Sequence, residues 1–209
     1  MAEVRAWSSC SGDRDFGTIR HMQDELASDE VRAAADVARR ALALFSVVGL
    51  ALGADRSQVL NWLSESQLWA ELTPSELGFI DTAAPSRKQV INASWLSERL
   101  VVLLWALALI DAVPKPTQHC DTAVFQDLVP PYAPISTEEF IGSAVLRPDA
   151  ELIAFADEAL NLHWEARDAK INERSSDAVD IEIIQERHHA INWIIGYDGL
   201  PWDEVTTDT

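Results

Sequence analysis

The sequence predicts an all-α protein, a single-domain multi-helix bundle around a central apolar helix at about residues 87–110, with little or no sheet. The first observation behind this is a series of helix-start signals, each followed by apolar residues spaced three and four apart. The second is that no stretch shows the two-residue alternation of a half-buried strand. The third is size, because 209 residues with 48% apolar content can bury a core without disulfides or a metal.

The chain begins with a segment that has no sustained apolar periodicity, residues 1–27, which we predict to be a mobile leader. A single helical domain is then expected over residues 28–209. Its first helix should span about residues 29–52, because Ser28 is a suitable N-cap and Gly53 a suitable terminator.

Capping patterns mark the helices that follow. Asp55 predicts the start of a second helix, and a threonine–proline–serine–glutamate pattern at residues 73–76 predicts a third. Ser86 then caps the central helix at residues 87–110. The second half of that helix, VVLLWALALI, is apolar on every side, so we expect other helices to cover it all round.

The second half of the chain opens with a cluster of five prolines, which predicts irregular structure over about residues 111–135. Ser136 then caps a short helix, and longer helices should follow at about residues 148–171 and 178–195. Trp202 lies beyond the last helix but is large and apolar. We therefore expect it to pack back onto the helices and to hold the tail in place.

The charge is strongly negative, with 34 acidic and 16 basic residues and a formal net charge of −18. Such a field repels phosphate groups, so we predict no nucleic-acid partner and no anionic membrane surface. The longest apolar run, ten residues, is about half of a membrane span. An acidic surface attracts a basic protein partner, although it also serves solubility.

Two cysteines do not make a disulfide framework, and the first twenty residues contain no apolar secretory core. Both observations favour a cytoplasmic protein. The phosphate loop, the dinucleotide fingerprint, the zincin motif and the serine-hydrolase elbow are all missing from the sequence. We accordingly predict no cofactor.

Several tryptophan-rich strings accumulate along the chain. In order they are WLSES.LW..LTPSE, SWLSERL..LLWAL, CD, LHWEARDA, ERHHAINW and WDEVTTDT. In order and spacing they resemble the domain-of-unknown-function family 4272, from about Ala41 to Thr209. The resemblance implies a mostly helical fold and brings no activity, substrate or catalytic residue. One departure is Leu96, where the family pattern has an arginine after Trp95.

A buried polar cluster is the candidate site. Glu98 lies within the apolar string SWLSERLVVLLW, so its carboxylate should be buried and needs a cationic partner. Arg99 is adjacent in sequence and points elsewhere, which leaves the two late helices to supply that partner. The candidate cluster, or pocket, consists of Glu98, His163, Arg167, Glu186, Arg187 and His188. A structural network is the leading interpretation, and a tryptophan-floored pocket for a carboxylate or phosphate is the other.

Two further patterns have plainer explanations. Glu186-x-x-His189 has the spacing of half a di-iron site, but no second such pair occurs, and we predict no metal site. His119-Cys120-Asp121 suggests a thiol nucleophile, but a cysteine anchoring a loop is the simpler interpretation. We assign no catalytic residue.

Two classes of function remain. The leading hypothesis is a soluble, non-catalytic interaction or regulatory protein with an acidic surface and a basic protein partner. The alternative is an enzyme or small-ligand binder that uses the histidine, arginine and glutamate cluster between the central helix and the two late helices. The sequence does not decide the oligomeric state.

Overall fold

The computed structural model describes residues 30–174 and 179–208, and this part of the chain is helical and contains no strand. The all-α prediction is therefore confirmed. The predicted leader, residues 1–27, and the predicted cap Ser28 lie outside the described residues.

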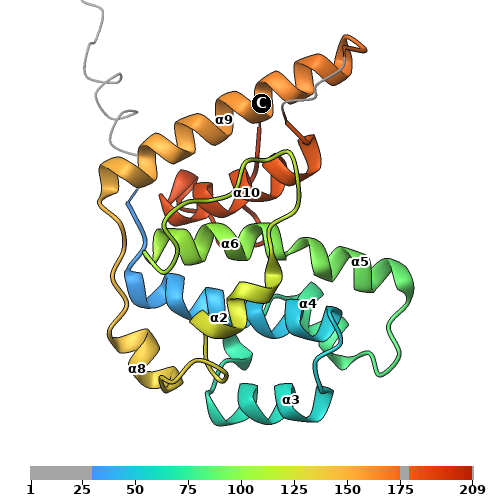
Figure 1. Cartoon of the computed structure of the whole chain (residues 1–209), viewed down its shortest axis with the longest axis vertical. Helices are drawn as coiled ribbons and strands as arrows, with labels where there is room; N and C mark the ends of the chain where they lie inside the picture. The colour runs from blue at the N-terminus through green and yellow to red at the C-terminus, as the bar shows by residue number, and fades with distance from the viewer. Residues whose placement is uncertain (1–29, 175–178, 209) are drawn as a thin grey trace, which may run out of the picture.

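Four helices stack in successive layers (Figure 1). The helix α9 (Asp149–Ile171) packs on α10 (Ile181–Ile194), α10 packs on α6 (Ser97–Ala106), and α6 packs on α2 (Ala34–Ala51). Because α6 lies between α2 and α10, Leu100 and the residues after it are buried all round. The prediction that the apolar segment 101–110 is covered on every side is confirmed for residues 101–107, whereas Ala108 is exposed and Leu109 and Ile110 are half-buried.

The shorter helices surround α2 and the ends of α6. The largest of them are α3 (Arg56–Glu65), α4 (Pro74–Asp81), α5 (Arg87–Trp95) and α8 (Thr137–Gly142), all of which contact α2. The remaining pieces are α7 (Phe125–Leu128) and the 3₁₀ turns η1 (Trp69–Glu71), η2 (Thr122–Val124) and η3 (Tyr197–Gly199).

The predicted caps form where the sequence places them. Thr73 and Ser86 each make a complete capping box with the residue three positions on. Asp55 and Ser136 each accept a hydrogen bond from the backbone N–H at the third helical position. Gly53 and Gly196 follow α2 and α10 in the left-handed backbone conformation, which glycine adopts at no steric cost. The first helix begins later than predicted, at Ala34 rather than at about residue 29.

The central helix is not continuous over residues 87–110. It is interrupted at Leu96, which separates α5 from α6, and it ends at Ala106. The Ser94 hydroxyl donates to the Ile91 carbonyl at 2.8 Å just before the interruption, and such back-bonding bends helices. At the other end Ala108 has a φ of 56°, so the chain leaves the helix through a left-handed turn.

The beginning of the described chain is tied to the end of α10. The Arg32 backbone N–H donates to the Ile194 carbonyl at 2.9 Å, and its side chain donates to the Trp193 carbonyl at 2.8 Å. Gly196 lies so close to Glu30 that a Cβ placed there would be 2.2 Å from the Glu30 carbonyl oxygen. Gly196 therefore meets two requirements, a positive φ and a close backbone contact.

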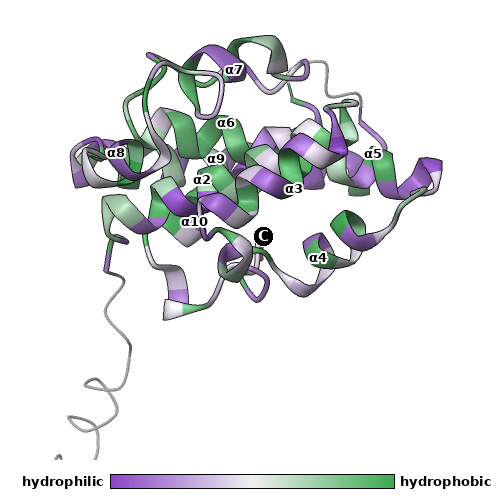
Figure 2. Ribbon diagram, turned by 90° about the horizontal axis from the view of Figure 1, so that it is seen from below, coloured by the Kyte–Doolittle hydropathy of each residue, from purple (hydrophilic) through white to green (hydrophobic). Residues whose placement is uncertain are grey.

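Apolar residues gather on α6 and α2 at the middle of the molecule, whereas polar residues predominate at the ends of peripheral helices such as α5 (Figure 2). Among the described residues, no helix combines the length and apolar character that crossing a membrane requires.

Candidate functional site

The structure divides the predicted polar residues among three groups of contacts. The first group is an ion pair between Glu98 and Arg187, whose side chains are 0% and 1% exposed. Arg187 Nε and Nη2 donate to the same Glu98 oxygen at 3.0 and 2.7 Å. α6 and α10 are thus joined by a bidentate, charge-assisted contact.

The loop after α6 closes over this ion pair. The second oxygen of Glu98 accepts a hydrogen bond from the Cys120 backbone N–H at 2.8 Å and lies 3.3 Å from His119 Nδ1. Arg187 also donates to the Pro114 carbonyl. These contacts satisfy both charged groups and attach the proline-rich segment to the helices, so we name this group the central lock.

Cys120 belongs to the central lock as a buried anchor. Burial, and next the charge of the Glu98 carboxylate, raise the pKa of the Cys120 thiol to about 12. Its sulfur donates to the Ser97 carbonyl at 3.5 Å. A thiol that stays protonated at neutral pH is a poor nucleophile, which supports the loop-anchor interpretation.

The second group is a pair of buried histidines, His163 on α9 and His188 on α10, with Nδ1 atoms 3.1 Å apart. Burial, and next the charge of His163, lower the pKa of His188 to about 4. Burial, and next Arg167, also lower the pKa of His163. Both rings are therefore neutral at pH 7, and one donates to the other. Arg167 itself is exposed on α9.

The third group contains Glu186, which does not join Arg187 but forms an ion pair with Arg99 of α6. Arg99 Nη1 also contacts His189 Nε2 at 3.1 Å. Arg99 and His189 were not among the predicted site residues. Both line a cleft that the sequence did not reveal.

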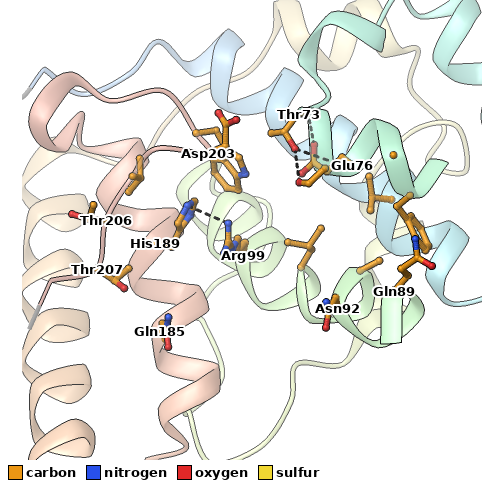
Figure 3. A pocket seen from close by; sticks show the side chains of 18 residues that line it. Thr73, Glu76, Gln89, Asn92, Arg99, Gln185, His189, Asp203, Thr206 and Thr207 are labelled. Carbon is orange, nitrogen blue, oxygen red and sulfur yellow. Dashed lines mark hydrogen bonds between the residues drawn. The ribbon is translucent and has the colours of Figure 1, made fainter. Parts of the chain in front are cut away.

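This cleft has a volume of about 760 Å³ and lies between α4, α5 and α6 on one side and α10 with the C-terminal tail on the other (Figure 3). We call it the tail cleft. Its polar lining consists of Thr73, Ser75, Glu76, Gln89, Asn92, Arg99, Gln185, His189, Asp203, Thr206 and Thr207. Its apolar lining includes Val47, Phe79, Ala93, Leu96, Trp202 and Val205.

One residue that lines the tail cleft, Glu76, belongs to a buried ion pair. Arg40 of α2 and Glu76 of α4, each 4% exposed at the side chain, form this pair. The second oxygen of Glu76 accepts the Thr73 backbone N–H at 2.9 Å, which completes the capping box of α4. Burial lowers the pKa of the Arg40 guanidinium, while the Glu76 charge acts in the opposite direction. The Arg40 guanidinium also donates to the Glu71 carbonyl, so Glu76 and Glu71 together compensate its burial.

Trp202 holds the tail against the same arginines. Its indole is 6% exposed, and the guanidinium carbons of Arg40 and Arg99 lie 4.5 and 5.8 Å from its ring centroid. The rings of His189 and Trp193 meet it edge-on at 4.9 and 5.1 Å. The prediction that Trp202 packs back onto the helices is confirmed, and cation–π contacts add to its apolar burial.

His189 is a neutral group at the edge of the tail cleft. Burial, and next the positive charge of Arg99, lower the pKa of His189 to about 3. Because a guanidinium can only donate, Nε2 accepts from Arg99 and the ring proton sits on Nδ1. That Nδ1–H interacts with the Trp202 backbone but makes no hydrogen bond of normal geometry among the described residues.

Glu186 and His189, which have the spacing of half a di-iron site, both contact Arg99: Glu186 pairs with it and His189 accepts from it. Within residues 30–174 and 179–208, no group of three or more histidine, cysteine, aspartate or glutamate side chains is arranged to hold a metal ion.

The sequence carried weak signals for the tail cleft. Arg39 and Arg40 are adjacent in a largely apolar helix, and of the two it is Arg40 that is buried. Trp202 was correctly expected to pack inward, but its neighbours are set by tertiary contacts between α2, α6 and α10.

Comparison with known proteins adds one positive finding. No curated protein and no solved structure matches the chain. The model of one family, described as a domain of unknown function, matches residues 20–205. The match begins within the segment predicted to be a leader and extends through Trp202 and Val205 of the tail cleft. The chain belongs to the family of domain of unknown function 4272 (DUF4272).

Proposed function

We propose that this protein binds a small, polar ligand of low net charge in the tail cleft. The proposal rests on which lining side chains are already paired within the protein and which are exposed to the cleft. The charged side chains Arg99 and Glu76 are occupied by protein partners, whereas the amides of Asn92 and Gln185 and the carboxylate of Asp203 are exposed on the walls. A volume of about 760 Å³ is in the range of small-molecule sites.

The pairing of the arginines argues against an anionic ligand. An anion at Arg99 would compete with Glu186, and an anion at Arg40 would compete with Glu76. Asp203 and the net charge of −18 add further repulsion. Amide and hydroxyl groups, by contrast, suit a neutral molecule with several hydrogen-bond donors and acceptors, while Phe79 and Leu96 offer it an apolar contact.

Binding rather than catalysis is supported by the state of His189. Its Nε2 lone pair is taken by Arg99, and a pKa of about 3 makes it a weak proton acceptor at neutral pH. Cys120, the other side chain suggested by sequence as reactive, lies in the central lock with a pKa of about 12.

A thermal-shift screen against neutral polar metabolites and blocked dipeptides tests this proposal. Ligands found in the screen are then titrated calorimetrically into the wild type, into Asn92→Ala/Gln185→Ala, and into the control Asn161→Ala, which lies on α9. Loss of binding in the cleft variant alone supports the proposal. The absence of any stabilising ligand, or binding that survives in the cleft variant, contradicts it.

A basic protein partner is the second candidate, and the charge distribution favours it. Residues 149–209 contain 15 acidic and four basic residues. Electrostatic complementarity would then give a non-catalytic interaction protein whose association weakens as salt is raised. Capture from native lysate at low and high salt tests this candidate, and a salt-insensitive set of bound proteins contradicts it.

A further inference from the structure

One side of α9 exposes a row of large apolar side chains. Ile153, Leu160, Trp164 and Ile171 are 49%, 41%, 56% and 70% exposed. Exposed side chains of this size, gathered on one helix, mark contact surfaces in soluble proteins.

The row is continuous along the helix. With Asp157 and Arg167, which are also exposed, the apolar residues follow one another at alternating steps of four and three residues. This is the spacing of a helix–helix seam. We call the row the α9 flank and define it as Ile153, Asp157, Leu160, Trp164, Arg167 and Ile171.

The α9 flank is distinct from the face that packs on α10. The buried face includes Ala169 and five residues that each lie one position before a member of the flank: Leu152, Ala156, Ala159, His163 and Ala166. One residue corresponds to about 100° of rotation around an α-helix, so the flank lies to the side of the buried face. In Figure 1, α9 forms the outermost of the four stacked helices.

The order of residues in the α9 flank is self-complementary. Ile153 and Ile171 are equally far in sequence from position 162, and so are Leu160 and Trp164. A second α9, antiparallel to the first and related by a two-fold axis at that position, would therefore place apolar residues opposite apolar residues.

The charged members of the flank obey the same symmetry. Asp157 and Arg167 are also equidistant from position 162, so an antiparallel pair would place each aspartate opposite the other subunit's arginine. A parallel arrangement would instead place like charges together. We propose that the protein forms a two-fold symmetric homodimer in which the two α9 flanks pack antiparallel.

A hollow beside the flank receives the largest side chain. This hollow has a volume of about 380 Å³. Its lining combines apolar and aromatic side chains with four polar ones: Val31, Ile153, Ala156, Leu160, Ile195 and Tyr197, with Asp157, His188, Asn192 and Asp208. Trp164 of the partner subunit lies opposite Leu160 in the antiparallel register and enters the hollow. Aromatic anchors in apolar pockets carry much of the affinity of protein interfaces.

Sedimentation velocity of the full chain in 150 mM salt, from low micromolar to about 200 µM, tests the dimer. We expect a concentration-dependent shift from monomer to dimer. Trp164→Ala should raise the dissociation constant of the dimer by about tenfold or more. The control Ile91→Ala, which removes a side chain 43% exposed on α5, should leave it unchanged. Circular dichroism confirms that each variant is folded.

Charge exchange is the sharper test of the register. Asp157→Arg and Arg167→Asp should each weaken the dimer, because each places like charges opposite one another, and the double exchange should restore it. A monomer at every concentration overturns the proposal, as does a dimer that these changes leave intact. Ligand binding in the tail cleft is a separate measurement, so either proposal can fail alone.

Discussion

The central lock and the tail cleft are both built around a buried arginine–glutamate pair, yet they differ in what surrounds the pair. Around Glu98 and Arg187, the loop supplies backbone groups that use the remaining hydrogen-bonding capacity. Backbone groups of Glu71 and Thr73 also bond Arg40 and Glu76, but Arg40 Nε has no hydrogen-bond partner among the described residues, and a cleft of about 760 Å³ lies beside Glu76. The same ionic contact thus fastens a loop in one place and supports a candidate binding site in the other.

The largest effect is expected at the central lock. Glu98→Ala should destabilise the fold by roughly 3–5 kcal/mol, because it strands the Arg187 guanidinium in a buried site. Arg187→Ala should cost a similar amount, and the double variant should lose much less than the two together. Urea denaturation measures all three, and additive losses would show that the pair is not coupled.

The corresponding change at the tail cleft should cost less. Glu76→Ala removes the Arg40 partner and the capping box of α4, but the neighbouring cleft admits water to the stranded cation. We expect a loss of about 2–3 kcal/mol. If urea denaturation gives equal losses for Glu76→Ala and Glu98→Ala, the two regions do not differ in the way proposed.

Removing the C-terminal tail tests the tail cleft without altering the central lock. Deletion of residues 200–209 takes away Trp202 and its contacts with Arg40 and His189, so the melting temperature should fall by several degrees. Because Trp202→Phe keeps an aromatic ring, it should lower the melting temperature by less than the deletion does. A melting transition that the deletion leaves unchanged would mean that the tail adds nothing to stability.

The last prediction concerns the dependence of stability on acid pH. The folded protein holds His188 with a pKa of about 4 and His189 with a pKa of about 3, against about 6.5 when unfolded. Below pH 6.5 these two histidines are protonated in the unfolded chain but stay neutral in the folded chain. The free energy of unfolding therefore falls as the pH drops from about 6.5 toward 4. Urea midpoints measured across this window should decline less steeply in His188→Gln. If the urea midpoint changes equally with pH in the variant and the wild type, His188 is not the cause of the acid sensitivity.

Local elements were largely predictable because their causes are local. The capping boxes at Thr73 and Ser86, and the stop at Gly196, depend on residues within one turn of the helix end. The break at Leu96 was missed, because apolar periodicity continues through it and the serine back-bond before it is a weak signal. Burial of Glu98 also followed from its neighbours in sequence.

The pairing of side chains from different helices was not predictable from the sequence. The sequence by itself determined an all-α fold, a buried Glu98 that needs a cation, and a tryptophan that returns to the core. Only the tertiary structure decided that Arg187 takes Glu98, that Glu186 takes Arg99, and that Arg40 and Trp202 meet beside a cleft. The physical reason is that helix formation depends on neighbours in sequence, whereas a charge pair depends on how separate helices cross and rotate.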